Sequence, residues 1–426
     1  MLKINKEHSQ EIRTAIQRLD EWIDHNGWAG YDPYDIKGSP LFIYLLKLPS
    51  TCPIPLRAFR AVLNRIERWQ PLRLRRLFRI EKQINPKALG LLAAGYLNLY
   101  EITGEGSFKE KAIECLEWLK KNPSDGFRGI CWGYPFDWLS KRFIPKGTPS
   151  AVVSGIIGHA FWAAYKIFRK EQYLNICEQI CEFFITNLNI SWIDNNCICF
   201  SYTPLDDFHI HNANLFVAEY LLRVGMELNR NDLLNFGHLA ANYALKEQNP
   251  DGSIFYWGAV QNHFNPNHMD HYHSGFEMRM LYNIGQTTED KRFKVALKRY
   301  YRYYLKNMMH PDNGYMIPKL NPKHLYPIDI HACAEAILCN STLAHEFREA
   351  QKLLPYLSLW VIKKMQTPQG WFRYTILKTP IGEYSANIPY LRWGQAWMLV
   401  ALSTYLKTIT NEIQNRSKQT CTWNDL

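Results

Sequence analysis

Six stretches of the chain are apolar on almost every helical face and rich in small residues. Five of them are followed by a second helical stretch with one charged face, over 108–121, 171–187, 231–248, 290–308 and 345–365. Helices that are apolar all round are usually buried, whereas helices with one polar face lie at the surface. The pattern therefore predicts an inner ring of helices enclosed by an outer ring. The inner stretches recur at intervals of roughly sixty residues and begin near Ala88, Ser150, Asn212, His271, Asp329 and Leu391.

The sixth inner stretch has no amphipathic stretch after it. The amphipathic segment 6–25 at the N-terminus supplies the missing outer helix and would close the ring. Turns rich in Pro, Gly and aromatic residues, such as NPSDGFRGICWG and NPDGSIFYWG, separate the hairpins and begin short extended segments. The sequence thus predicts an all-α fold, an (α/α)6 toroid or barrel of six helical hairpins with short β-hairpin loops. We expect one toroid domain over 1–408 and a C-terminal tail over 409–426, whereas an open solenoid would carry atypical repeats at both ends.

The composition is consistent with one large folded domain. Hydrophobic residues make up 47% of the chain and aromatic residues 14%, enough for a large core and for rings that line a sugar-binding cleft. The start of the chain is charged and no run of about eighteen apolar residues occurs, so we expect a cytoplasmic protein. The 10 cysteines lack paired CxxC spacing, which indicates buried free thiols. We expect no metal centre and no cofactor.

Much of the formal net charge of +11 lies in one amphipathic insertion, residues 57–82. This insertion holds nine Lys or Arg residues and two Glu residues, a net charge of +7. Three interpretations are open: a solvated helix packed on the domain, a segment that contacts an anionic membrane, or a nucleic-acid patch. The sequence contains no nucleic-acid-binding motif, so nucleic acid is not an expected partner.

Polar and aromatic residues gather where the inner helices begin. If the inner helices are parallel, their N-termini open on one face of the ring, and the helix dipoles there favour an anionic ligand. Ser, Thr, Asp and Asn at these positions could equally serve as helix caps. Together with the aromatic loops, these positions predict a sugar-binding mouth. Its expected substrate-binding residues are Asp32, Tyr34, Trp132, Tyr134, His211, Asn212, His273, His331, Arg392, Trp393 and Gln395.

Several carboxylates near this mouth are candidate acids and bases. In GYDPYD and WGYPFDW, Asp35 and Asp137 stand among aromatic rings, where desolvation raises the proton affinity of a carboxylate. Aspartate beside proline also forms turns, which is the structural alternative. Asp270 and Asp329 precede inner helices and could instead cap them. The candidate catalytic residues are Asp35, Asp137, Asp270, Asp329, His271 and Tyr202.

The chain resembles a known family across nearly its whole length. The motifs that carry the resemblance are GYDPYD, CWGYPFDW, TPSAVVSGIIGHAF, QNPDGS, DHYHSGF, YPIDIH and IPYLRWGQAW. They are similar to those of a bacterial and archaeal family found with surface-polysaccharide biosynthesis proteins, which more distantly resembles the six-hairpin glycosidase superfamily. The resemblance implies an (α/α)6 toroid that acts on a glycan or a lipid-linked oligosaccharide. The DxDD and DDxxD motifs of terpene cyclases and the zinc-binding Cys and His pattern of lanthionine cyclases are missing.

Three functions fit these residues. The first is a carbohydrate-active enzyme of surface-polysaccharide biosynthesis or processing that cleaves a glycosidic bond in an anionic glycan, with two of the four aspartates as acid and base. The second is a uronate lyase or C5-epimerase, in which Tyr202 or His271 removes a proton while Asn212 and Arg392 neutralise the sugar carboxylate. The third is a non-catalytic glycan-binding or assembly subunit. In each case the insertion 57–82 could hold the protein at the inner face of the membrane.

Overall fold

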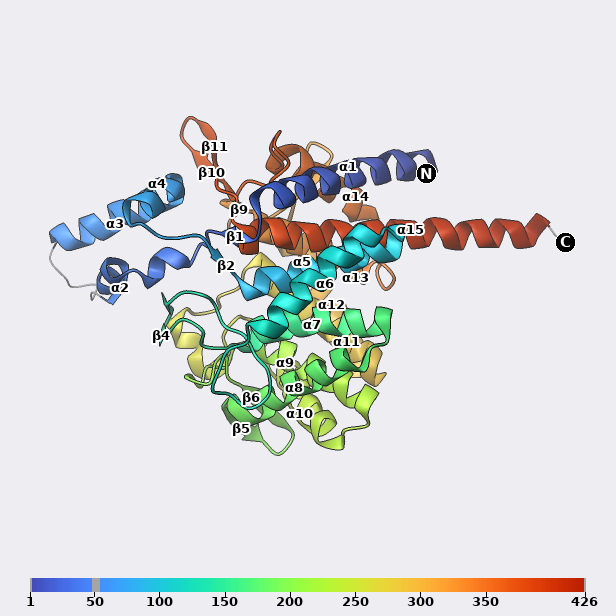
Figure 1. The fold of residues 1–426 in the computed structure, drawn as a ribbon, viewed down its shortest axis with the longest axis horizontal. Helices are drawn as coiled ribbons and strands as arrows, with labels where there is room; N and C mark the ends of the chain where they lie inside the picture. Colours follow the sequence, from blue (N-terminus) through green and yellow to red (C-terminus); the bar gives the residue numbers. More distant parts are fainter. Residues whose placement is uncertain (1, 48–53, 425–426) are drawn as a thin grey trace.

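Six inner helices form a closed ring in the computed structural model, which describes residues 2–47 and 54–424. Each inner helix packs against the next, and the last one returns to pack against the first. In Figure 1 the red α15 lies beside the light-blue to cyan α5, the contact that closes the ring. The inner helices are α5 (Pro86–Thr103), α7 (Ala151–Phe168), α9 (His211–Leu228), α11 (His271–Thr288), α13 (Ile330–Leu343) and α15 (Ala396–Asn424).

Outer helices pack behind this ring. The N-terminal helix α1 (Leu2–Asn26) contacts α14 and α15 and completes the last hairpin, as the amphipathic pattern of 6–25 predicts. The predicted (α/α)6 toroid of helical hairpins is therefore confirmed. The other outer helices are α6 (Gly106–Lys121), α8 (Glu171–Asn187), α10 (Asn231–Glu247), α12 (Lys291–Asn307) and α14 (Arg348–Met365).

Small residues and helix caps set the geometry of the inner ring. A Cβ atom at Gly158 on α7 would lie 2.6 Å from the ring of Tyr220 on α9, so a larger residue there would push the two helices apart. Asp270 and Asp329 accept hydrogen bonds from backbone N–H groups in the first turns of α11 and α13. These caps fix where the inner helices begin, and with them the side chains at the mouth of the ring.

Short antiparallel strands occupy the connections between helices. The three-stranded sheet has the order β11-β10-β9, and the other four sheets are two-stranded. Three short helices, η1 (Asp35–Gly38), η2 (Ala259–Phe264) and η3 (Leu391–Gln395), complete the loops. The strands are β1 (Ala29–Gly30), β2 (Gln83–Ile84), β3 (Trp138–Leu139), β4 (Phe143–Ile144), β5 (Ile190–Asp194), β6 (Cys197–Phe200), β7 (Met309–Asp312), β8 (Tyr315–Pro318), β9 (Ile328–Asp329), β10 (Thr375–Thr379) and β11 (Gly382–Ala386).

Three helices between α1 and α5 project from one side of the ring (Figure 1). They are α2 (Pro40–Lys47), α3 (Ile54–Trp69) and α4 (Pro71–Leu77), and we call them the α2–α4 segment. This segment contains most of the basic insertion 57–82. It encloses a small core separate from the main one, formed by Ile36, Phe42, Leu45, Leu63 and Leu74.

Arg75 ties the α2–α4 segment to the ring. Its guanidinium is fully buried, lies 2.9 Å from a carboxylate oxygen of Asp35 and donates to the carbonyl oxygen of Asp32 at 2.8 Å. A second carboxylate, that of Glu67, lies 3.5 Å from the same guanidinium. Arg75 therefore adds no charge to the outer surface of the insertion, unlike its exposed neighbour Arg76.

Helices α15 and α7 concern two expectations from the sequence, the C-terminal tail and the lack of a membrane-spanning segment. Helix α15 continues to Asn424, so residues 409–424, expected as a tail, prolong the last inner helix. Helix α7 is long and apolar enough to cross a membrane by length and composition alone, but 67% of it is buried inside the ring. The eight cysteines for which the structure gives a state are free and buried.

Candidate functional site

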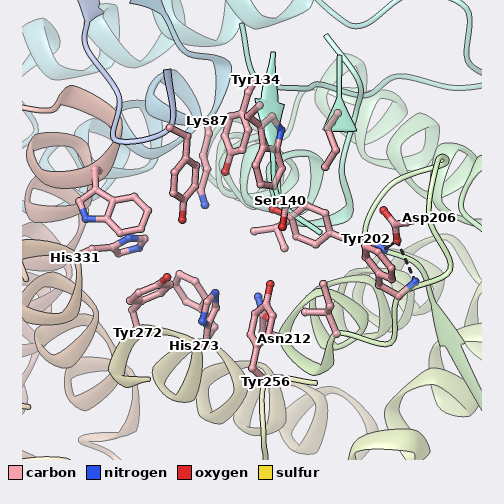
Figure 2. Close-up of a pocket in the computed structure, with 18 of the residues that line it drawn as sticks. Lys87, Tyr134, Ser140, Tyr202, Asp206, Asn212, Tyr256, Tyr272, His273 and His331 are labelled. Carbon is pink, nitrogen blue, oxygen red and sulfur yellow. Dashed lines mark hydrogen bonds between the residues drawn. The ribbon is translucent and has the colours of Figure 1, made fainter. Parts of the chain in front are cut away.

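The second residue of every inner helix lines one cavity inside the ring. For the last inner helix this residue belongs to η3, which leads directly into α15. The cavity has a volume of about 190 Å³ and lies where the inner helices begin (Figure 2). Equivalent positions of the six repeats therefore meet at one height in the ring. The six residues are Lys87, Val152, Asn212, Tyr272, His331 and Arg392.

Aromatic side chains from the connecting loops wall the same cavity. The ring of Tyr34 stacks on that of Trp138 at 5.6 Å with an interplanar angle of 9°. A Cβ atom at Gly133 would lie 2.1 Å from the carbonyl oxygen of Thr148, so only glycine lets the loop carrying Tyr134 approach this closely. Flat rings of this kind suit the apolar faces of a sugar. The aromatic wall comprises Tyr34, Tyr134, Trp138, Tyr202, Phe208, Tyr256, Trp257 and Trp393.

A hydrogen-bonded Asp and His stand at the start of α11. Asp270 caps the helix through one oxygen and contacts Nδ1 of His273 with the other, at 2.6 Å. Burial opposes the ionisation of Asp270, but the nearby His273 and His268 outweigh it and hold the pKa of this carboxyl well below its usual range. Nε2 of His273 has no hydrogen-bond partner among the described residues, and the side chain lines the cavity. An ionised carboxylate thus fixes a histidine whose outer nitrogen is available to a ligand.

The same residues are the candidate metal ligands. His268, Asp270 and His273 place one donor atom each within 4.8 Å of one another, and no other such group was found in 2–47 and 54–424. Ligands around a tetrahedral zinc ion lie about 3.3 Å apart, given bonds of about 2.0–2.1 Å. The contact between Asp270 and His273 is shorter, at 2.6 Å. A metal ion would therefore have to replace this hydrogen bond.

His331 contributes a second imidazole to the cavity. Its ring stacks on Tyr272 at 4.5 Å with an interplanar angle of 10°, and Trp393 meets it edge-on at 4.5 Å. Neither ring nitrogen has a hydrogen-bond partner in the part of the chain that the structure describes. Burial, together with the positive charge of Lys87, lowers the pKa of His331 well below its ordinary value. The imidazole is therefore neutral at physiological pH and keeps an N–H group that it can donate.

Two lysines of the cavity were missed from the sequence. Lys87 is only 3% exposed, points into the cavity and forms no ion pair or hydrogen bond through its amine in the described part of the chain (Figure 2). Lys37 lines the cavity from η1, with its amine 4.5 Å above the ring centre of Tyr34. Burial lowers the pKa of both amines. Lys87 could have been found from the repeat, because it occupies the second position of its inner helix, as Asn212 and His331 do in theirs.

Arg392 binds a carboxylate of the protein with two of its nitrogens. Its Nη2 donates to Oδ1 of Asp32 at 2.5 Å, and its Nε donates to the other oxygen of the same carboxylate. The guanidinium lies about 5 Å from the ring centres of Tyr34, Tyr134 and Trp393. This bidentate pair positions the aromatic wall, so Asp32 and Arg392 hold the cavity in shape instead of presenting a free charge to it.

A second cavity adjoins the first. It has a volume of about 460 Å³ and shares Tyr34, Lys37, Tyr272 and Trp393 with the first one. Two carboxylates that the sequence singles out, Asp270 and Asp329, also line it, together with the carboxylate of Glu67. We call these two adjoining cavities, which share four lining residues, the cleft.

Asp329 is buried beneath Trp393. It accepts hydrogen bonds from the indole N–H of Trp393 at 2.9 Å and from the backbone N–H of His331 at 2.7 Å. Burial nevertheless dominates and raises the pKa of Asp329 to about 7. Near neutral pH, Asp329 is therefore partly protonated, whereas Asp270 is ionised.

We expect Asp329→Asn to change how stability depends on pH. A carboxyl whose pKa is raised by folding binds more protons in the native state, so stability falls as pH rises from about 4, the unfolded value, to about 7, the folded value. Asparagine keeps the cap and the contact with Trp393 but cannot ionise. As pH rises through this window, the unfolding free energy of the variant should therefore increase relative to that of the wild type. Above the window the difference between the two should be constant. Urea denaturation at several pH values measures this, with Asp125→Asn on an exposed loop as the control. A constant difference between variant and wild type would contradict the expectation.

The comparison with solved structures identifies the architecture. A D-mannose isomerase matches with a TM-score of 0.57 and 14% identity over 76% of this chain and 87% of its own. A sugar epimerase from a ruminal bacterium matches with a TM-score of 0.59 and 11% identity over 77% and 90%. An unsaturated glucuronyl hydrolase specific for heparin matches with a TM-score of 0.55 and 12% identity over 93% and 96%. The chain has the six-hairpin glycosidase fold.

These likenesses concern the fold alone. No protein-family model matches the chain, and no curated protein matches it by sequence. Within the six-hairpin fold, the chemistry of the site has to be read from its own residues.

Of the residues that the sequence singles out, one group lines the two cavities of the six-hairpin ring. Asn212 presents a side-chain oxygen without a hydrogen-bond partner. Tyr202 stands on the far side of the first cavity from His331 (Figure 2). The residues brought together in this way are Tyr34, Tyr134, Tyr202, Asn212, Asp270, His273, Asp329, His331, Arg392 and Trp393.

Three predicted site residues on or near inner helices face away from the cavities. His271 turns to the outer ring, where Nε2 lies 2.9 Å from the hydroxyl of Tyr304 on α12. His211 stacks on Tyr243 of α10 at 5.0 Å. The side-chain amide of Gln395 accepts a hydrogen bond from the backbone N–H of Phe372 and donates one to its carbonyl oxygen. Each of these polar groups holds inner and outer layers together.

The remaining predicted residues lie in loops outside the cavity lining. The indole N–H of Trp132 donates to the carbonyl oxygen of Leu119 in the core. Asp137 accepts a hydrogen bond from the backbone N–H of Lys146 at 2.6 Å, which joins the residue before β3 to the chain after β4. Burial raises the pKa of Asp35 to about 6 although Arg75 opposes it, but this carboxylate faces the α2–α4 segment. Asp137 and Asp35 thus act in the fold in this structure.

Proposed function

We propose that the protein is a carbohydrate-active enzyme that removes a proton from a carbon atom of a sugar, as an epimerase, isomerase or lyase does. The observation that carries the proposal is the absence of a free carboxylate from the first cavity. Among the described residues Asp206 is the only carboxylate in its lining, and both of its oxygens are taken by Thr203 and by backbone N–H groups. Two imidazoles with unsatisfied nitrogens stand there instead.

His273 is the base in this proposal. Asp270 accepts a hydrogen bond from the Nδ1–H of His273, which keeps the proton on Nδ1 and leaves the lone pair of Nε2 directed at the ligand. The proton comes from a carbon next to a carbonyl or carboxyl group, and its electron pair moves toward that oxygen. His331, as a neutral N–H donor, stabilises the oxygen on which negative charge develops. Return of the proton to the neighbouring carbon or to the other face gives the isomer or the epimer.

Incubation with sugars in deuterated water tests this proposal. A panel of aldoses, ketoses and uronates is followed by proton NMR and mass spectrometry. We expect deuterium to enter one carbon position of a sugar without addition of water. A product heavier by one water molecule, with no deuterium on carbon, would contradict proton abstraction and favour hydrolysis.

Hydrolysis of a glycosidic bond is the second candidate. It is favoured by the second cavity, where Asp270 is ionised and Asp329 is partly protonated near pH 7. Two carboxyls whose pKa values are pushed apart in this way resemble the base and acid of a glycosidase. Under this alternative, Asp329→Asn abolishes activity. Under proton abstraction by His273, the same variant keeps most of its activity.

We further propose that the enzyme acts on surface-polysaccharide intermediates in the cytoplasm and contacts an anionic membrane through the α2–α4 segment. Helix α3 exposes apolar side chains at helical spacing, with Phe59 44% exposed, Val62 52% and Ile66 37%. The exposed Arg73 and Arg76 follow on α4. An apolar stripe beside positive charge suits the boundary between lipid headgroups and acyl chains. Lipid-linked oligosaccharides would be presented to the cleft from such a surface.

Replacing Arg73, Arg76 and Arg79 together by Gln should release the protein from anionic vesicles. Each basic residue near the lipid surface contributes about 1 kcal/mol, so we expect a loss of up to about 3 kcal/mol at low salt. Co-sedimentation with phosphatidylserine vesicles measures the loss. The control replaces the exposed Lys298, Arg302 and Lys306 of α12 by Gln, which removes the same charge elsewhere. Equal losses in both triple variants would show a general effect of net charge and contradict a docking surface.

A further inference from the structure

We propose that the substrate is an anionic sugar whose carboxylate or phosphate is bound by Lys87 with help from Lys37. The inference rests on the proposed function for its reaction, but the binding site stands on separate observations. The sequence pointed to Arg392 for this task, whereas the structure places other cations there.

Lys87 is a buried amine without an anionic partner among the described residues, and its Nζ lies 5.5 Å from the ring centre of Trp397. The residue is 3% exposed and lies at the second position of α5, with its amine directed into the first cavity (Figure 2). Buried lysines are almost always paired, because removing an ammonium group from water is costly. Burial lowers the pKa of this amine in the free protein, and an anionic ligand in the cavity would supply the partner that favours its charged form.

The carboxylates around Lys87 are already occupied. Asp32 is held by both nitrogens of the Arg392 fork. Glu335 receives two hydrogen bonds from Arg279, at 2.6 and 3.0 Å. Asp32 and Glu335 are the carboxylates whose charge acts on the amine of Lys87. The protein therefore offers no free anion to this amine in the described residues.

Lys37 places a second amine at the boundary of the two cavities. It lines both of them and forms no ion pair within 2–47 and 54–424. Its position on η1 is fixed by close packing, since a Cβ atom at the neighbouring Gly38 would lie 2.0 Å from the carbonyl oxygen of Asp137. The two amines thus approach the cleft from the first inner helix and from the loop that leads to the α2–α4 segment. Two amines that become charged beside an anion favour an anionic sugar over a neutral one.

A carboxylate on the sugar also fits the chemistry of His273. When a proton leaves the carbon next to a carboxylate, a second negative charge develops on that group. A neighbouring ammonium stabilises this charge most strongly where water is excluded. A sugar phosphate would use the same cations for binding but would keep its charge away from the reacting carbon. A uronate therefore uses Lys87 in both binding and reaction.

Binding measurements with D-glucuronate, glucose 6-phosphate and D-glucose test the inference. Ligand binding is followed by calorimetry and by the fluorescence of the tryptophans that line the cavity. We expect the wild type to bind glucuronate at least about tenfold more tightly than glucose, and Lys87→Met to lose this preference. Lys37→Met should lose part of it, and Lys352→Met on the exposed face of α14 should keep it. Tighter binding of glucose 6-phosphate alone would assign the site to a phosphate.

The stability of Lys87→Met gives a second readout. If the amine has no partner in the free protein, its removal should leave the melting temperature unchanged or raise it. Glucuronate and glucose 6-phosphate that bind no more tightly than glucose would overturn the inference, as would a Lys87→Met protein that keeps the preference for an anion. Deuterium entering a neutral sugar without any preference for anions leaves the proposed function standing and removes this inference. Binding that is selective for anions, without deuterium exchange, would support this inference and contradict the proposed function.

Discussion

Replacing His273 by asparagine should lower the turnover rate by about 10²–10⁴-fold, the usual contribution of a general base. Sugar binding should change little, because the aromatic wall and the lysines remain. Asp270→Asn should also lose most of the activity. The asparagine amide can donate to Nδ1 of His273, which would place the proton on Nε2 and remove the lone pair that accepts the substrate proton. Deuterium exchange into the sugar measures both losses.

Two neighbouring histidines provide matched controls. His268→Asn removes a partly exposed ring whose Nε2 lies 3.4 Å from Asp270, and we expect it to keep the turnover rate within about tenfold. His271→Asn breaks the contact with Tyr304 in the outer ring, so it should lower stability while the folded fraction keeps its activity. Equal loss of activity in His268, Asp270 and His273 variants, together with loss of bound metal from the purified protein, would instead assign these three residues to a metal ion.

The fold was predictable because one physical pattern recurs along the chain. Inner helices such as α7 are apolar all round, since they are covered on one side by their neighbours in the ring and on the other by outer helices. The unpaired last inner helix and the amphipathic start of the chain predicted the contact between α1 and α15. The predicted tail could not be distinguished from a longer helix, because exposed polar residues suit both.

The sequence predicted the level along the ring axis at which the site lies, but not which side chains at that level face the cavity. Consecutive residues of a helix point about 100° apart, so Tyr272 can face the cavity while His271 faces Tyr304. A shift of one residue decides which of the two is functional, and only packing between the layers fixes it. Aligning the six inner helices on their second residue would have favoured Tyr272 and found Lys87.

The partners of two carboxylates could not be predicted for a related reason. Asp35 stands among aromatic residues and its pKa is raised to about 6, but its partner comes from elsewhere in the chain, whereas Asp137 is bound by the backbone N–H of Lys146 in its own hairpin. Arg75 reaches Asp35 from the α2–α4 segment, forty positions away in sequence. Such long-range pairing follows from the tertiary fold and leaves no local pattern.

Arg392→Gln should destabilise the protein by about 3–5 kcal/mol, because it leaves the carboxylate of Asp32 buried without its cation. Asp32 is 3% exposed and Arg392 is 1% exposed, so water cannot replace the lost partner. Arg392→Lys should recover only part of the loss, since an ammonium group cannot make the bidentate contact with both oxygens. Urea denaturation measures each variant.

The double variant Asp32→Asn with Arg392→Gln separates a structural pair from a substrate contact. Two neutral amides can still hydrogen-bond at this site, so the double variant should be more stable than Arg392→Gln alone, with a coupling of about 1–3 kcal/mol. Lys87, which has no such partner, should show no comparable loss when it is replaced. An Arg392→Gln protein that unfolds like the wild type but binds glucuronate much more weakly would reverse the assignment. In that case Arg392 neutralises the sugar carboxylate, and Asp32 only orients the guanidinium of Arg392.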